Sequence, residues 1–212
     1  MYVLKPIPHS GRDLPRIREF ATQHGGEGVR VRPGDLMEVA AENGLALELS
    51  DAQGTAAIAL LYDFSRDDAV FGEIGTMVVG PDHQGQGLQH FLASVQLIQI
   101  AAQDYPFDGG NIFAVVTPGT ASEHVLVNKV GFVDWSPGEL VTELRSLAGI
   151  PFNPEKRNLS APNGAIKRAA EFLLSLRASA QVYRVPTGDS KVRIEFSWPF
   201  DEVVDELADV EK

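Results

Sequence analysis

A glycine-bearing loop offers the clearest chemistry in the chain. It follows an apolar stretch, Met77, Val78 and Val79, and precedes a segment with helical spacing of apolar residues; its members are Gln84, Gly85, Gln86, Gly87, Leu88 and Gln89. A loop that opens directly onto a helix presents unpaired backbone N–H groups and the positive end of the helix dipole. Phosphate groups bind at such positions. The sequence therefore predicts an anion site over residues 84–89.

Two other phosphate-binding loops do not fit the chain. A P-loop requires Gly-x-x-x-x-Gly-Lys-Ser/Thr, and no Gly-Lys pair occurs anywhere. A dinucleotide-binding fingerprint that began at Gly85 would need glycine at the position of His90. The remaining alternative is structural, because glycine and proline are the usual residues of a tight strand-to-helix connection.

The loop and the strand before it resemble the acyl-CoA-binding motif of the GNAT superfamily of N-acyltransferases. The family loop is Gln/Arg-x-x-Gly-x-Gly/Ala, and residues 84–89 fit every position except the last, which is Gln89. Val130-Gly131-Phe132 also resembles the ending of a later family helix. The resemblance is strong over residues 71–104 and 121–132 and weak over the rest of 1–136. It implies an α/β fold with a mixed sheet that splays apart where acetyl-CoA or CoA enters.

The resemblance also implies roles for particular residues. The backbone of residues 77–79 would bond the pantetheine arm, and the amides of residues 84–89 would bind the pyrophosphate without help from lysine or arginine in the loop. Glu73 lies on the preceding strand, where some family members carry a glutamate that deprotonates the acceptor amine directly or through water. The alternative is an outward-facing glutamate, because alternation along a strand does not say which face is buried.

The usual general acid of the family is missing from the chain. The family helix commonly carries Tyr four residues before the glycine of its Gly-Phe ending and Asn seven residues before that Tyr; these positions are Val127 and Thr120 here. His124 precedes Val127 by three residues, close to one helical turn, and histidine titrates near neutrality. His124 is therefore the candidate acid. The alternatives are a histidine exposed on the helix, Ser122 as a weaker donor, and water.

Periodicity predicts the elements that must position these residues. We expect strands over residues 1–7, 45–49, 57–64, 71–79, 111–117 and 132–135, and helices over 35–43, 88–102 and 121–129. A further helix is expected to begin after an N-cap at Ser10 or Asp13 and to end at Gly25-Gly26. Prolines and asparagines at 151–163 indicate a linker, followed by a helix over 165–180, a hairpin over 182–198 and an acidic helix over 201–212. This pattern divides the chain into a GNAT-like core over residues 1–150 and a C-terminal extension over 151–212.

The extension has an apolar strand face that must be covered. Its members alternate with polar residues and are Val192, Ile194, Phe196 and Trp198. Leaving four such side chains in water would be costly. The extension therefore either supplies the last strands of the same sheet or acts as a separate docking element, and a homodimer is one way to cover this face.

Composition limits the class of protein. The 212 residues, 44% of them hydrophobic, suit one globular domain with an appendage. The absence of cysteine excludes disulfides, thiolate metal sites and a cysteine nucleophile, and the histidine spacing indicates no metal site. The net charge of −11 argues against a nucleic-acid partner. No leader and no apolar run of membrane-spanning length is present in the sequence, so we expect a cytoplasmic protein without a membrane partner.

Taken with the resemblance, these features predict an acyl-CoA-dependent N-acyltransferase that transfers acetyl directly to a small-molecule or peptide amine in a ternary complex. Acceptor choice is expected to lie in the loops at 25–33 and 105–110. Two alternatives remain open. One is a catalytically silent relative that binds CoA, suggested by Val127, Thr120 and Gln89. The other is an interaction protein that works through the C-terminal extension.

Overall fold

A computed structural model describes residues 1–8, 13–26, 34–66, 69–102, 111–135, 155–188, 190–198 and 200–209. Within these ranges the strands form one mixed sheet in the order β6-β7-β5-β4-β3-β2-β1-β10-β9-β8. The strands are β1 (Tyr2–Pro6), β2 (Ala46–Asp51), β3 (Gly54–Arg66), β4 (Ala69–Val79), β5 (Ile112–Val116), β6 (Val133–Asp134), β7 (Arg157–Ser160), β8 (Arg177–Ser179), β9 (Val182–Thr187) and β10 (Ser190–Phe196).

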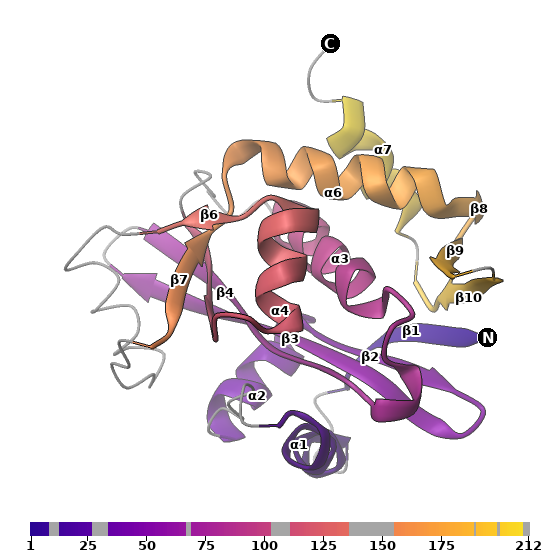
Figure 1. The fold of residues 1–212 in the computed structure, drawn as a ribbon, viewed down its shortest axis with the longest axis horizontal. Helices are drawn as coiled ribbons and strands as arrows, with labels where there is room; N and C mark the ends of the chain where they lie inside the picture. The colour runs from indigo at the N-terminus through magenta and orange to yellow at the C-terminus, as the bar shows by residue number, and fades with distance from the viewer. Residues whose placement is uncertain are drawn as a thin grey trace.

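Helices cover both faces of the sheet. They are α1 (Asp13–His24), α2 (Gly34–Glu42), the 3-10 turn η1 (Pro81–His83), α3 (Leu88–Ala102), α4 (Ala121–His124), the π-helical turn η2 (Val125–Val130), α6 (Asn163–Leu176) and α7 (Asp201–Asp209). Figure 1 shows α1 and α2 beneath the sheet and α3, α4, α6 and α7 above it. The central strand β3 is buried on both faces over residues 56–62, which explains why that stretch has no charged residue and none of the small polar ones.

The ladder between β4 and β5 is short, and this opens the sheet. The two strands pair in parallel only at Gly72↔Ile112 and Glu73↔Phe113, while β5 pairs with β7 along its length. A bulge also interrupts β4 opposite β3, between the pairs at Ala59 and Leu61. A bulge bends the strand that carries it. The carboxyl-terminal halves of β4 and β5 therefore separate, as the resemblance implied for the site of cofactor entry.

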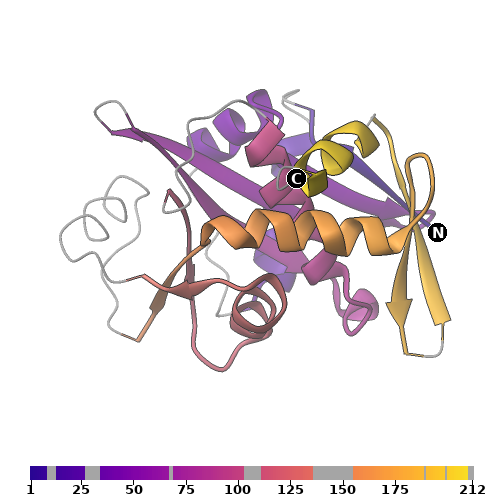
Figure 2. The ribbon, with the colours of Figure 1, turned by 90° about the horizontal axis from the view of Figure 1, so that it is seen from above.

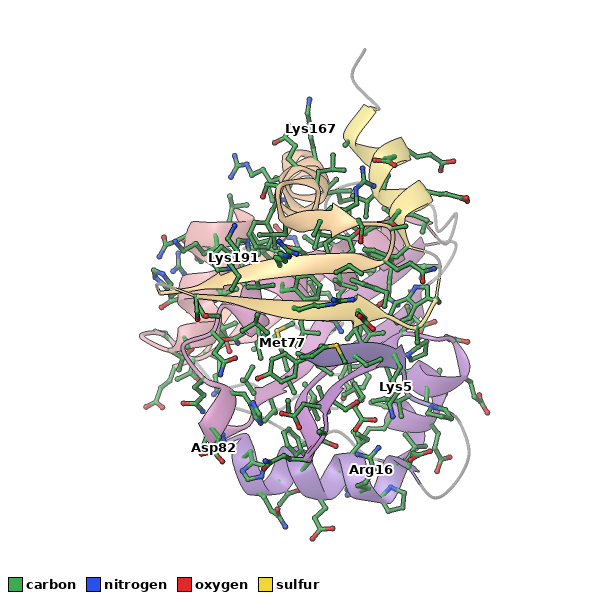
Figure 3. All side chains as sticks on the ribbon, turned by 90° about the vertical axis from the view of Figure 1, so that its right-hand side faces the viewer. Lys5, Arg16, Met77, Asp82, Lys167 and Lys191 are labelled. Carbon is green, nitrogen blue, oxygen red and sulfur yellow. The ribbon has the colours of Figure 1, made fainter. Side chains whose placement is uncertain are left out.

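The C-terminal segment completes the sheet at both ends. Strand β10 pairs in parallel with β1, and β7 lies between β5 and β6. Figure 3 shows the β9–β10 hairpin alongside β1, and Figure 2 shows α6 lying across the sheet with α7 beside it. The sequence left open whether the hairpin joins the same sheet or forms a separate docking element. In the structure it joins the sheet.

Two expectations for this segment were wrong. The expected linker contains β7, whose sequence Arg157-Asn158-Leu159-Ser160 shows no strand alternation and is held by neighbours on both sides. The helix expected to reach residue 180 ends at Leu176, because the next residues pair with β9 as β8. In both cases pairing between distant residues overrides local propensity.

The apolar face expected on β10 is present. Ile194 and Phe196 are buried, and Val192 and Trp198 are half-buried against the same core. Helix α7 covers this region with Val204, and its Asp201 accepts a hydrogen bond from the buried Tyr183 hydroxyl at 2.7 Å. None of the helices in the described ranges is long and apolar enough to cross a membrane.

Candidate active site

A cavity of about 730 Å³ opens between the separated ends of β4 and β5. Its walls come from three regions: strand β4 with the loop and first turn of α3, strand β5 with the helix that follows it, and the end of α1. The lining residues include Glu73, Ile74, Met77, Val78, Val79, Gln84–His90, Val115, Val116, Thr117, Ser122, Val125, Leu126, Lys129 and Lys156. All the residues predicted to hold the cofactor therefore line one cavity.

The loop has the backbone that an anion site requires. Gly85 and Gly87 adopt positive φ values of 74° and 73°, which other residues rarely adopt. The first helical bond of α3 joins the Phe91 N–H to the Gly87 carbonyl at 3.1 Å. The N–H groups of residues 88–90 consequently have no partner within the helix. These three residues line the cavity at the positive end of the helix.

Side chains outside the loop hold it in place. The Tyr2 hydroxyl, on β1, lies 2.7 Å from His83 Nδ1 and donates to Gln86 Oε1 at 3.0 Å. Gln84 Nε2 donates to the Val79 carbonyl at 3.3 Å. Burial, followed by the negative charge of Asp51, raises the pKa of Tyr2, so its hydroxyl stays protonated and able to donate at neutral pH. The loop is thus tied to β1 and to the end of β4.

Glu73 lies on the cavity wall at the point where β4 and β5 part. Its side chain is 1% exposed, and its neighbours in register are Tyr62 on β3 and Phe113 on β5. The sequence allowed the Glu73 side chain to face outward or inward, and in the structure it faces inward. A carboxylate in this position can accept a proton from a group bound in the cavity.

His124 lies away from the cavity. It is exposed, its Nδ1 lies 2.9 Å from the Asn128 side-chain nitrogen, and it is not among the lining residues. After it the helix widens to a π turn, in which the N–H groups of Gly131 and Phe132 both reach the Leu126 carbonyl, at 2.9 and 2.8 Å. The side chains that this segment presents to the cavity therefore include Val125 and Leu126, neither of which can donate a proton.

Two lysines that sequence reasoning missed supply positive charge to the cavity. Lys129 lines it from η2, and Lys156 lines it from the residue before β7, where its ammonium group hydrogen-bonds Thr117 Oγ1. Neither has a local signal in the sequence: Lys129 belongs to a helix and Lys156 to the proline-rich stretch taken as a linker. Lys156 reaches the cavity through the pairing of β7 with β5, and Lys129 through the packing of η2 against α3.

His90 forms part of the wall between α3 and α6. Its ring stacks on Phe172, with centroids 3.7 Å apart and planes 19° from parallel. Burial, with a smaller contribution from the charge of Lys129, lowers the pKa of His90 to about 4. The imidazole is therefore neutral at pH 7 and adds no charge to the site.

The start of α4 is rigidly held. The Thr120 hydroxyl accepts from the Glu123 N–H at 3.4 Å, and Glu123 Oε2 accepts from the Gly119 N–H at 2.7 Å. Arg157 on β7 pairs with Glu123 at 2.6 Å and with Asp134 at 2.5 Å. Hydrogen bonds from Arg157 lower the pKa of both carboxyls, so the network persists at neutral pH. No group of three or more His, Asp or Glu side chains in the described part of the chain gathers as a metal site.

No protein-family model matches the chain, and no curated protein matches it. Solved structures do. N-acetylglutamate synthase from Neisseria gonorrhoeae, complexed with coenzyme A and N-acetyl-glutamate, matches with a TM-score of 0.55 and 19% identity over 76% of this chain and 35% of that one. The NatC complex bound to Gag peptide and CoA matches with a TM-score of 0.55 and 11% identity, over 75% of this chain and 95% of that one.

Diaminobutyrate acetyltransferase from Paenibacillus lautus, in complex with its substrate L-2,4-diaminobutyric acid and coenzyme A, matches with a TM-score of 0.53 and 14% identity, over 76% of this chain and 95% of that one. This chain therefore spans about a third of the Neisseria enzyme but nearly all of the Paenibacillus one. Identities this low show shared architecture alone. With its splayed sheet and its glycine loop opening onto α3, the chain has the fold of the GNAT acetyltransferases.

Proposed function

We propose that this protein is an acyl-CoA-dependent N-acyltransferase that transfers acetyl from acetyl-CoA to an amine. One observation carries the proposal: a single cavity is lined both by the glycine-bearing loop with the first turn of α3 and by a buried carboxylate, Glu73, at the point where the strands part. The structural neighbours that carry CoA support it, since a bound CoA is what their descriptions share.

The residues present fit coenzyme A. Its phosphates would meet the amides of residues 84–90, with Lys129 and Lys156 supplying the cations that the loop lacks. The pantetheine arm would lie along the separated end of β4, residues 77–79, between apolar walls that include Val115 and Leu126. The cavity volume of about 730 Å³ is within the usual range for organic ligands.

Acetyl-CoA supplies the acetyl group as a thioester, which an uncharged amine can attack. Glu73 accepts the proton of the acceptor ammonium, directly or through water, and so generates that amine. The nitrogen lone pair would form the new C–N bond as the C–S bond breaks, the sulfur would leave as a thiolate, and the nitrogen would release a second proton to give the neutral amide. Because His124 is outside the cavity lining and Val125 and Leu126 cannot donate a proton, we infer that this proton reaches the thiolate through water or the Ser122 hydroxyl, which lines the cavity.

The test is a CoA titration by calorimetry together with a thiol-release assay against a panel of amines. The proposal expects both binding and acetyl-CoA-dependent thiol release with at least one amine that greatly exceeds hydrolysis. Binding without transfer to any amine would instead favour a silent CoA-binding protein, the alternative suggested by the apolar residues in the place of the acid. Absence of binding would overturn both.

A further inference from the structure

Gln89 departs from the loop pattern at a sensitive position. It is the second residue of α3, where the GNAT loop has glycine or alanine, and it lines the cavity next to the free N–H groups. Its side chain does not cover those groups. Instead Gln89 Nε2 donates a hydrogen bond of 2.7 Å to Ser122 Oγ on α4, a residue that also lines the cavity.

The partner of Gln89 is on a segment with little freedom. Ser122 lies between Thr120, which caps α4, and Glu123, which is bound both to the Gly119 N–H and to Arg157. The Ser122 hydroxyl is therefore a fixed anchor, 33 residues away in sequence and on the opposite wall from the loop. This anchor selects one direction for a side chain that would otherwise sample many rotamers.

An unanchored glutamine would compete with the ligand. In a capping box, a Glu or Gln at the third helical position turns its side chain back and accepts a hydrogen bond from a free N–H group at the helix start, and Gln89 is one position earlier in α3. The carbonyl oxygen of Gln89 would then occupy the donors that a phosphate needs. We propose that Ser122 is a positioning residue, which holds Gln89 away from the anion site and so keeps that site open. This inference rests on the proposed binding of CoA phosphates at the loop.

The experiment measures CoA affinity by calorimetry for the full-length wild-type protein and for Ser122→Ala, Ser122→Thr, Gln89→Ala and the double variant Gln89→Ala/Ser122→Ala. Ser122→Ala should weaken binding roughly two- to tenfold, the range expected for one net hydrogen bond. Ser122→Thr keeps the hydroxyl and should bind as wild type does. Gln89→Ala should bind at least as tightly as wild type, because nothing remains to block the site.

The double variant tests whether Ser122 affects CoA binding only through Gln89. It should recover the affinity of Gln89→Ala, since Ser122 acts only through Gln89. If CoA affinity falls by the same factor in Ser122→Ala and in the double variant, the inference is overturned. It is also overturned if Gln89→Ala loses as much CoA affinity as Ser122→Ala does. Thermal unfolding of each variant checks that the fold is retained. Failure of the wild type itself to bind CoA would overturn the proposed function, and this inference with it.

Discussion

Glu73 is the residue on which the proposed chemistry depends. Its carboxyl is buried in the cavity wall, and replacing it by Gln keeps the shape while removing the base. We expect Glu73→Gln to lower kcat by about a hundredfold or more, the usual contribution of a general base, and to leave CoA affinity unchanged. Steady-state kinetics and CoA titration measure the two effects separately.

His124 provides the matched control for that prediction. It is exposed and bonded to Asn128, so His124→Ala should retain wild-type kcat and the same pH profile. A loss of activity in His124→Ala comparable to that of Glu73→Gln would restore His124 as a catalytic residue and would require the segment to turn on substrate binding.

Lys129 and Lys156 are predicted to bind phosphate, not the acyl end of the ligand. Removing either charge should weaken CoA binding about tenfold, as expected for one charge-assisted hydrogen bond. Binding of pantetheine, which has no phosphate, should not change. Lys191 is exposed on the β10 hairpin outside the cavity lining, so Lys191→Ala is the control. Equal losses for CoA and pantetheine in Lys129→Ala and Lys156→Ala would contradict this assignment.

The stacked pair of His90 and Phe172 joins helices α3 and α6, and it should make stability depend on pH. Because the pKa of His90 is lowered in the folded protein, to about 4 from an ordinary value of 6.5, the unfolded chain binds the proton first as pH falls. The contribution of His90 is thus fully present above pH 6.5 and is lost as pH falls toward 4.

Thermal unfolding at pH 7.5 and pH 5 measures this loss. Replacing His90 by Phe should make the decrease in Tm between the two pH values smaller, because Phe cannot bind a proton and can still stack on Phe172. His124→Ala should leave the pH dependence unchanged, since that histidine is exposed. Identical decreases in the wild type and His90→Phe would show that other groups control the pH dependence.

The loop before α3 depends on two glycines for different reasons. Both have positive φ, but a Cβ at Gly85 would meet open space, whereas one at Gly87 would lie 3.2 Å from Val185 Cγ1 on β9. Gly85→Ala should therefore cost only the backbone strain, roughly 1–2 kcal/mol of folding stability. Gly87→Ala should cost more and should also weaken CoA binding, because either Val185 or the loop must shift by a few tenths of an ångström to make room for the new methyl group. Equal effects in unfolding and titration experiments would contradict the role of β9.

Elements with strong local patterns could be predicted from the sequence, and elements made by distant pairing could not. Helix α3 has the predicted bounds because its apolar periodicity is long and it follows a glycine loop. Strand β7 has no such pattern and exists because β5 and β6 flank it. The π turn after His124 has no local signal in the sequence either. For that reason the sequence did not predict Lys156 and the Gln89–Ser122 pair in the cavity wall, whereas it drew attention to the glycine loop and Glu73, which the structure places in that wall.

At the scale of the whole molecule, the cavity and the C-terminal segment form one unit. Strand β10 pairs with β1, whose Tyr2 hydroxyl bonds His83 and Gln86 in the loop region. Val185 on strand β9 lies so close to Gly87 that a Cβ there would come within 3.2 Å of it. The segment after residue 150 therefore helps to shape the site as well as to cover the core.

Truncation after Gly149 tests whether the cavity depends on the C-terminal segment. It removes α6, α7 and the strands β7–β10, and it uncovers the core side chains that now meet the buried Tyr183, Ile194 and Phe196. Burial of such side chains contributes roughly 1.5–3 kcal/mol each, so the loss is comparable to the whole stability of a typical domain. We expect the truncated chain to be insoluble or to lack a cooperative unfolding transition, and any soluble fraction to bind no CoA. A truncated chain that stays monomeric, melts as cooperatively as the full chain and binds CoA would mean that residues 150–212 are a detachable module.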